Sequence, residues 1–307
     1  ASTPEPVEIP KAKAKIIEIK PSPKKHQQDS QTILDPNVLF MLLTAEIAGQ
    51  RGQYDVAMEG YLEAAKRVHD PRLTERAALI AMYMKDSNKT NEAVSLWLKQ
   101  DPNNLSARKI AALSALKAEN KEQAVEQLNS LLKQDPAGFE KTLFELAGAL
   151  QKEDNIQFIY DVMETLSVKN PNQASIFFIQ SLLASDMKNK GLADKKVERA
   201  LQLQPDWDKA LILQAQLAVY ADDFKRAEAL LEAASVKYPE NHKFNKMLAQ
   251  VLIKSGNYEE AGDVFEKLLA KNPKDYESQF SLGLVYLQLD KDNKAETIFT
   301  QLQDQES

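Results

Sequence analysis

Apolar residues follow a helical spacing in paired segments along most of the chain. In the segment HKFNKMLAQVLIKSGNYEEAGDVFEKLLAKNP, one apolar face contains Leu248, Val251 and Leu252, at steps of three and four residues. The residues SGNY interrupt this face, and a second face begins at Ala261. It ends before Pro273, because proline cannot donate a helical hydrogen bond. The pattern predicts two antiparallel helices joined by a short turn.

The same pattern returns at a nearly constant interval. Prolines follow the apolar segments at Pro36, Pro71, Pro102, Pro136, Pro171, Pro205, Pro239 and Pro273. In the second half of the chain a small residue recurs every 34 residues, at Ala193, Ala227, Ala261 and Ala295. Small side chains at fixed positions let helix backbones approach closely. The chain is therefore expected to be a stack of similar helix pairs.

One repeat carries the residues of a known motif, namely Leu248, Ala249, Gly256, Tyr258, Ala261, Phe265 and Pro273. In period and residue types it resembles the tetratricopeptide repeat. The resemblance implies an all-α, right-handed superhelical solenoid of about eight helix-turn-helix repeats over residues 36–307. The repeats are expected to begin near residues 38, 71, 105, 140, 174, 208, 242 and 276.

Local features refine this expectation. Gly52 and Gly256 stand where the chain turns between helices, and glycine adopts the left-handed conformation at little cost. Asp35, Asp70 and Asp101 each precede a proline and are predicted to cap the following helix.

Two repeats depart from the pattern. In the second repeat Ala93 comes three residues late, which predicts a longer turn at KDSNKTN and a shorter second helix. Ile159 replaces the usual small residue in the fourth repeat, so its helices are expected to lie further apart. Trp97 and Trp207 are expected to be buried between repeats.

The two ends of the chain differ from its middle. Residues 1–35 are rich in proline and lysine and are predicted to form a flexible tether, spanning about 33 Å as a random coil. As an alternative, the alternation in KAKAKIIEIK favours docking as a strand or contact with an anionic surface. At the other end Ile298, Phe299 and Leu302 lack a following repeat to cover them. The natural chain is expected to continue with more repeats, or this helix to pack on another molecule, including a second copy.

Composition narrows the function. The 307 residues carry a formal net charge of −6, whereas nucleic-acid binding is indicated by a strongly basic charge balance. They include no cysteine. No apolar run reaches the length of about 20 residues that spans a bilayer. His26, His69 and His242 form no metal-spaced pair, and no glycine-rich phosphate loop is present. The sequence therefore predicts neither a catalytic site nor a cofactor or metal.

The inner surface of the solenoid is the predicted binding site. In tetratricopeptide arrays the first helices line this surface, and the resemblance assigns to it Leu79, Met82, Leu113, Leu116, Phe144, Phe178, Leu182, Ile212, Val219, Ile253 and Phe280. Basic residues lie among them, at Lys109, Lys141, Lys209, Lys243 and Lys246. An apolar floor with basic flanks suits an amphipathic helix or an extended segment of a partner protein. Packing between repeats is the alternative role of the apolar residues. The Lys–Asn clamp by which some members of the family hold a peptide carboxylate is not preserved, because Leu113 follows Lys109 where asparagine is required.

A narrower resemblance covers the first third of the chain. The segments AEIAGQRGQYDVAMEGYLEAA and KRVHDPRLTERAALIAMY are similar to bacterial outer-membrane lipoproteins that act as adaptors for a periplasmic carboxyl-terminal processing protease. The resemblance implies a lipidated cysteine ahead of Ala1, a location in the periplasm or at the outer membrane, and cell-wall hydrolases as delivered substrates. Two alternatives are an assembly factor for a pilus, secretion or envelope complex, and the regulatory region of a larger enzyme. The residues themselves leave a cytoplasmic location open.

Overall fold

The computed structural model describes residues 35–150 and 155–305, which form sixteen α-helices and no β-strand. The helices come in pairs. The first helices are α1 (Pro36–Gln50), α3 (Pro71–Tyr83), α5 (Leu105–Lys117), α7 (Phe139–Leu150), α9 (Ala174–Asp186), α11 (Asp208–Tyr220), α13 (His242–Lys254) and α15 (Tyr276–Gln288). The second helices are α2 (Tyr54–Arg67), α4 (Ser87–Gln100), α6 (Lys121–Gln134), α8 (Ile156–Lys169), α10 (Lys190–Leu203), α12 (Phe224–Lys237), α14 (Tyr258–Lys271) and α16 (Asp292–Gln305). The predicted tether lies outside the described residues, apart from Asp35.

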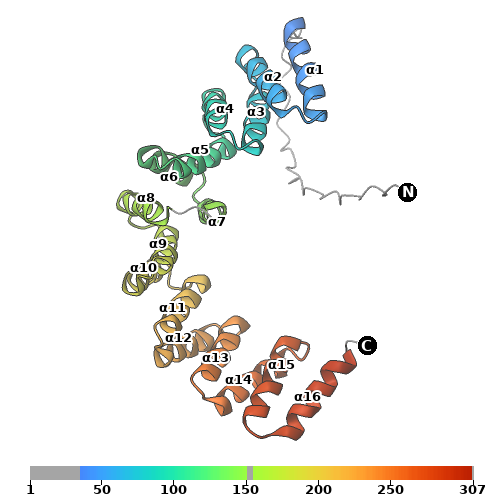
Figure 1. Ribbon diagram of the computed structural model, residues 1–307. Helices are drawn as coiled ribbons and strands as arrows, with labels where there is room; N and C mark the ends of the chain where they lie inside the picture. Colours follow the sequence, from blue (N-terminus) through green and yellow to red (C-terminus); the bar gives the residue numbers. More distant parts are fainter. Residues whose placement is uncertain (1–34, 151–154, 306–307) are drawn as a thin grey trace, which may run out of the picture.

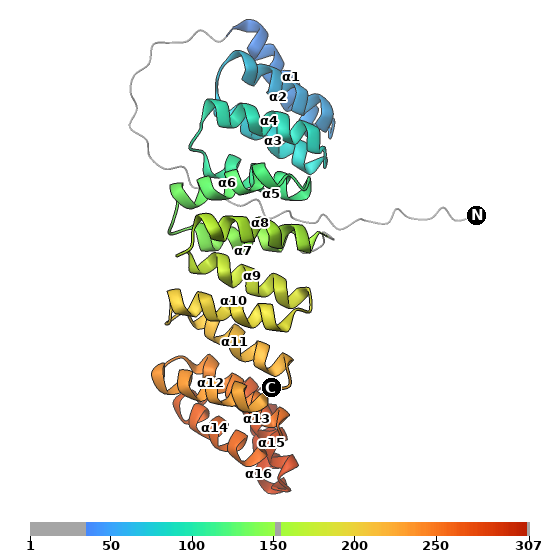
Figure 2. The same ribbon diagram turned by 90° about the vertical axis from the view of Figure 1, so that its left-hand side faces the viewer.

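The pairs are stacked into a crescent. Its concave side is formed mainly by the first helices and its convex side by the second helices (Figure 1). Seen from the convex side, the helices follow one another like the rungs of a ladder (Figure 2). The buried side chains form three successive clusters along the stack, spanning Ala45 to Ala107, Ala112 to Leu217 and Ala215 to Ala295. The predicted all-α solenoid is confirmed.

Helix starts follow the predicted capping chemistry in two of three cases. The Asp35 carboxylate accepts a hydrogen bond from the Asn37 N–H at 2.9 Å, and Asp70 accepts one from Arg72 at 3.0 Å. The prediction for Asp101 is wrong, because α5 begins later and is capped by the Asn104 side chain. Asp101 instead ends α4 and accepts a hydrogen bond from Asn104.

In the seven pairs whose turn is described, the turn closes the first helix by the same hydrogen bonds. At the end of α1, the Gly52 N–H bonds to the Gly49 carbonyl and the Gln53 N–H to the Ala48 carbonyl, as in a Schellman motif. Gly52 and Gly256 have φ values of +74° and +83°, so the predicted left-handed conformation is confirmed. Elsewhere a residue with a Cβ atom takes this place, at Lys85, Glu119, Lys188, Asp222 and Asp290.

Replacing Lys85 by glycine is expected to stabilise the protein. At a φ of 59° a residue with a Cβ atom carries a left-handed penalty of roughly 1–2 kcal/mol. Glycine removes this penalty but adds conformational entropy to the unfolded chain, so the expected net gain is about 0.5–1 kcal/mol. Thermal melting followed by circular dichroism measures it. Gly256→Ala is the reverse change and should lower the melting temperature; a gain there would contradict the reasoning.

Small residues let the second helices pack closely. Ala57, Ala124, Ala193, Ala227, Ala261 and Ala295 each stand at the fourth position of their helix and are fully buried. Thr90 takes this place in α4, buried, with its hydroxyl donating to the Asp86 carbonyl. The predicted longer turn and shorter helix of the second repeat are therefore wrong. The small residue is replaced rather than displaced, and α4 has 14 residues like its counterparts.

Trp97 and Trp207 are buried, as predicted. At the C-terminal end, the ring of Phe299 packs over Gly283 and lies 5.7 Å from the ring of Phe280. Ile298, Phe299 and Leu302 are half-buried. They are thus partly covered by their own repeat.

The fourth pair is built differently from the others. In each of the other seven pairs the two helices pack along one another, whereas α7 lies against α5 and α9, and α8 lies against α6 and α9. Figure 1 shows α7 displaced toward the concave side of the crescent. The wider spacing expected from Ile159 is confirmed. The large side chain stands where alanine allows close approach in the other repeats.

Candidate protein-binding surface

A hollow of about 630 Å³ lies on the concave side at the middle of the crescent. It is formed by α7, α9 and α11, the first helices of three successive repeats. Its lining combines apolar and charged side chains, namely Ala137, Glu140, Lys141, Phe144, Phe178, Leu182 and Lys209. Five of these seven residues belong to the predicted binding surface. The structure thus brings together residues that are up to 68 positions apart, since Lys141 and Lys209 line the same hollow.

Aromatic rings form the floor of the hollow. The Phe144 and Phe178 rings meet edge to face with centroids 5.6 Å apart, and Phe178 lies 4.7 Å from the Trp207 ring. Phe178 is 5% exposed, so it supports the floor from within the core, whereas Phe144 is half-buried. The Lys209 ammonium lies 4.9 Å from the Phe144 ring centre, where a cation–π attraction operates. The floor is apolar and held from three helices.

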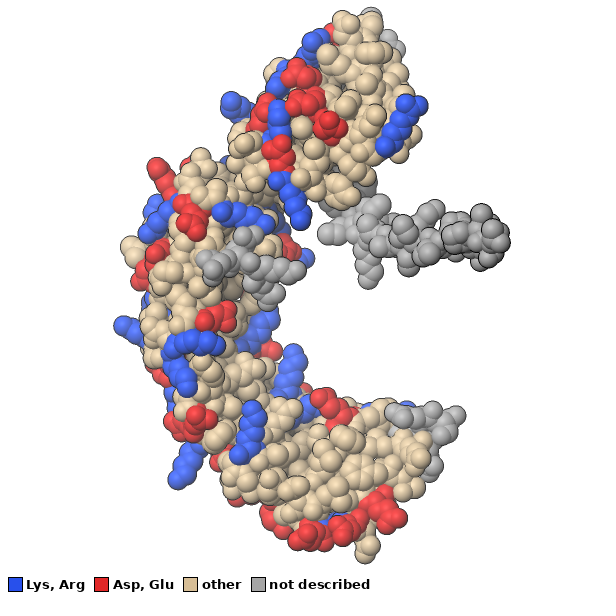
Figure 3. Space-filling model, viewed as in Figure 1, with Lys and Arg blue, Asp and Glu red and all other residues tan. Residues whose placement is uncertain are grey.

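The predicted basic flanks are paired with glutamates of α7. Lys209 Nζ lies 2.6 Å from a Glu140 oxygen, and Lys109 Nζ lies 2.9 Å from Glu145. Lys141 is 3.9 Å from Glu145, and its side chain is 83% exposed. The Lys109 pair therefore links the neighbouring first helices α5 and α7, and the Lys209 pair links α11 to α7 across α9. Lys141 is the most accessible of the three cations. Lys and Arg side chains are visible along the inner edge of the crescent in Figure 3.

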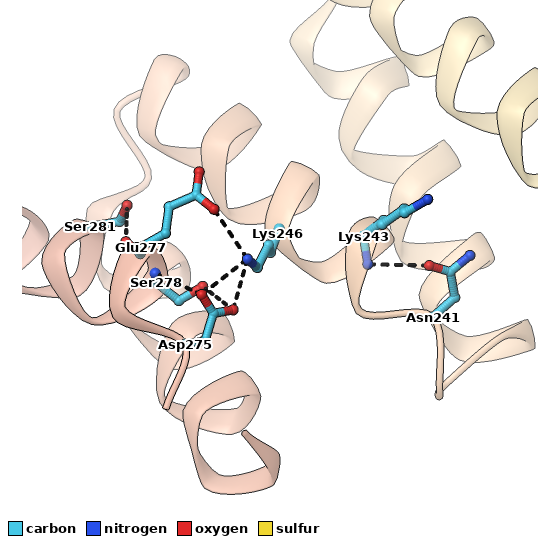
Figure 4. A network of polar contacts seen from close by, with 7 residues as sticks. All are labelled: Asn241, Lys243, Lys246, Asp275, Glu277, Ser278 and Ser281. Atoms are coloured by element: carbon cyan, nitrogen blue, oxygen red, sulfur yellow. Dashed lines mark hydrogen bonds and ion pairs between the residues drawn. The ribbon is translucent and has the colours of Figure 1, made fainter. Parts of the chain in front are cut away.

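A second polar network joins α13 to α15. Lys246 Nζ lies 2.8 Å from Asp275 and 3.2 Å from Glu277, while the Lys243 side chain points away from them (Figure 4). The Asp275 carboxylate caps α15 by accepting from Ser278. Burial alone would raise the pKa of Asp275, but the ion pair with Lys246 and the hydrogen bonds from Ser278 outweigh it, so this pKa lies below its usual value. Lys246 thus serves the contact between repeats, and Lys243 remains exposed.

The remaining predicted residues are not equally accessible. Leu79, Met82 and Phe280 are exposed, whereas Leu113, Ile212, Val219 and Ile253 are half-buried. For Leu116 the prediction needs correction. Its side chain is 1% exposed and packs within the core cluster of Ala112 to Leu217, so it cannot form part of a surface.

Sequence reasoning missed the apolar surface of α1. Leu39, Phe40, Leu43 and Ile47 are exposed there. The signal was available, because these four apolar residues recur at steps of one, three and four positions along one helix. Exposed apolar side chains also follow α15, at Tyr276, Phe280, Leu284 and Leu287. In Figure 3 the inner side of the last repeats carries few charges, while acidic side chains gather on their outer edge.

The described part of the chain contains no candidate metal site and no helix suited to cross a membrane. No group of three or more His, Asp or Glu side chains within it could hold a metal ion. None of the helices in residues 35–150 and 155–305 is long and apolar enough to cross a membrane. The GQRG segment forms the end of α1 and the following turn, as its sequence predicts.

Comparisons with known proteins agree with the repeat architecture. Two tetratricopeptide-repeat family models match residues 212–275 and 252–307. The TPR repeat-containing protein PA4667 from Pseudomonas aeruginosa is 26% identical over 233 residues, which cover 74% of this chain and 37% of that protein. The chain thus spans less than two fifths of the length of this relative.

Two solved structures are also similar. MamA from Desulfovibrio magneticus RS-1 has a TM-score of 0.45 and 14% identity, covering 54% of this chain and 94% of that chain. A tetratricopeptide repeat protein from Parabacteroides merdae has a TM-score of 0.40 and 13% identity, covering 88% and 93%. The tetratricopeptide repeats are matched over residues 212–307, and helix pairs of similar length precede them in the described residues 36–150 and 155–211.

Proposed function

We propose that the chain is a non-catalytic scaffold that binds a segment of another protein in the hollow formed by α7, α9 and α11. The observation that carries this proposal is the lining of the hollow, where the half-buried Phe144 and Leu182 lie beside the exposed Lys141. Apolar side chains beside an accessible cation suit an amphipathic or extended segment with an acidic residue. Tetratricopeptide repeats generally bind proteins rather than catalyse reactions, which supports the same function.

The finer proposal concerns place and partner. We infer an adaptor of the bacterial cell envelope that binds a periplasmic carboxyl-terminal processing protease and presents substrates such as cell-wall hydrolases to it. The similarity of residues 45–83 to the adaptor lipoproteins supports this proposal. A lipid anchor ahead of Ala1 is part of the same proposal.

Affinity capture from an envelope extract, followed by mass spectrometry, tests both the proposed binding surface and the proposed partner. The double variant Lys141→Glu with Phe144→Ala reverses the accessible charge and removes the half-buried ring, and is expected to reduce capture of the partner by about tenfold or more. The protease and its substrates are the expected partners. Pilus or secretion components in their place would support the assembly-factor alternative.

The matched control is Lys133→Glu with Val168→Ala. It makes the same kinds of change at exposed positions of α6 and α8, on the convex side. Capture by this control should equal that of the unmodified protein, and circular dichroism should show equal helix content in all three. Equal capture by both double variants would show that the hollow is not the binding surface.

A further inference from the structure

An apolar cavity of about 420 Å³ lies behind the hollow, between α7, α8 and α9. Its walls are mostly apolar. They consist of Leu116, Leu143, Phe144, Leu146, Ala147, Gly148, Leu150, Ile156, Ile159, Met163, Ile179, Leu182, Leu183, Ser185 and Asp186. A volume of this size is within the range of about 300–1,000 Å³ in which proteins hold ligands.

The cavity arises from the separation of α7 from α8. Since α7 rests on α5 and α9, the space that a closely packed hairpin would fill remains open. Ile159 stands on the α8 wall where six other repeats have alanine and the second has threonine, and Gly148 stands on the α7 wall without a side chain. A Cβ atom added at Gly148 would meet no atom within 4 Å. Among the described residues, Ile159 thus accompanies the wider spacing of the pair, and Gly148 adds no side chain to the space.

The chemistry of the walls selects the occupant. A cavity lined by Leu, Ile, Met and Phe offers water few hydrogen-bond partners, so it favours an apolar group. Its two polar residues, Ser185 and Asp186, are adjacent at the end of α9. The exposed carboxylate of Asp186 disfavours an anionic head group such as that of a fatty acid. A neutral hydrocarbon group is the best match.

The cavity and the hollow share a wall. Phe144 and Leu182 line both, and each is half-buried. A segment lying in the hollow therefore passes next to the cavity, separated from it by these two side chains. Side-chain rotation at Phe144 or Leu182 is a small rearrangement compared with a movement of the backbone.

We propose that the cavity is a specificity pocket that receives one large apolar side chain, Leu, Met or Phe, of the protein segment bound in the hollow. The proposal rests on the proposed function, because the bound segment supplies the side chain. The shared wall of Phe144 and Leu182 favours a protein segment over a free hydrocarbon, since the occupant enters from the surface where the segment lies.

Methionine methyl NMR provides a direct test without a known partner. The protein has seven methionines, and among them Met163 lines the cavity. The probes are capped pentapeptides Gly-Ser-X-Ser-Gly in which X is Leu, Met, Phe or Gly. With Leu, Met or Phe the Met163 methyl signal should shift in a saturable manner, while the other six signals remain in place. With Gly at X no shift is expected.

Two variants fill the cavity, and one serves as their control. Gly148→Leu and Ala147→Leu each add a side chain to the α7 wall, and are expected to weaken the Met163 response to the Leu peptide by at least tenfold. Gly191→Leu is matched to the first, because Gly191 is also a helical glycine with no atom within 4 Å of an added Cβ, but it lies on α10. This variant should respond like the unmodified protein. The six other methyl signals report whether each variant is folded.

Two results would overturn the inference. The first is a Met163 signal that none of the Leu, Met and Phe peptides moves. The second is a signal moved by 4-methylpentanamide, which is leucinamide without its α-amino group, but not by the Leu peptide, which would indicate a site for a free small molecule. Neither result changes the outcome expected of the capture experiment with the Lys141→Glu and Phe144→Ala variant. The two proposals can therefore fail separately.

Discussion

Replacing Phe244 by alanine is expected to lower the free energy of unfolding by about 3–5 kcal/mol. The Phe244 side chain is 0% exposed at the start of α13, and its ring lies 5.9 Å from that of Tyr238 at the end of α12. The substitution removes a ring from the junction of two repeats and leaves a cavity there. Urea denaturation followed by circular dichroism measures the loss.

Phe280→Ala provides the matched control. The same side chain stands at the fifth position of α15, where it is 52% exposed on the concave side. Its removal should lower the free energy of unfolding by less than about 1 kcal/mol, because substitutions at exposed positions have small effects on stability. The contact that it loses is the edge-to-face packing on Phe299. Equal losses for the two variants would contradict the assignment of core and surface.

Replacing Gly60 by valine is expected to destabilise the first repeat by about 2–3 kcal/mol. A Cβ atom at Gly60 would lie 2.8 Å from the Ala45 Cβ and 3.4 Å from the Met41 carbonyl oxygen. Because these are a short side chain and a backbone atom of α1, neither can move aside without shifting the helix. Hydrogen exchange should show faster exchange in α1 and α2, and urea denaturation should show the loss of stability.

The same kind of change has the opposite sign where the glycine has space. Gly191→Ala, in α10, adds a methyl group that meets no atom within 4 Å. Alanine favours the helix over glycine by roughly 0.5–1 kcal/mol, so this variant should be slightly more stable than the unmodified protein. Losses of similar size for both glycines would show that close helix approach is not what Gly60 provides.

The repeated part of the fold was predictable because its signals recur. Ala193, Ala227, Ala261 and Ala295 stand 34 residues apart, and one geometry of close approach explains them all. The error at the second repeat has the same origin. Ala93 was taken for the displaced small residue, whereas Thr90 fills its place, since a threonine that bonds its hydroxyl to the backbone is small enough to be buried there.

The candidate site was predictable only in part. The resemblance to tetratricopeptide repeats placed Phe144 and Lys209 on the inner face, but their mutual contact depends on the curvature of the stack, which no local pattern encodes. The ion pair of Lys209 with Glu140 joins residues 69 positions apart and neutralises a charge that the sequence presented as free. Leu116 shows a different limit. The same resemblance placed it on the inner face, but its side chain is buried in the core.

The cavity was indicated by the sequence without being predicted. Ile159 marked the fourth pair as more widely spaced, but the direction in which the helices separate is set by the supports of α7 on α5 and α9. Those supports are contacts between neighbouring repeats, which appear only when the whole stack is assembled.

A chain built in this way can change its length by duplicating or losing whole 34-residue units. A new unit inserted beside α10 or α12 meets a neighbour of the same construction, because both helices carry a fully buried alanine, Ala193 or Ala227, at their fourth position. The fourth unit is the exception, since Ile159 and the displaced α7 match no other unit. Gain and loss of units over generations should therefore spare this one position, and the lengths of the two arms on either side of it should vary independently.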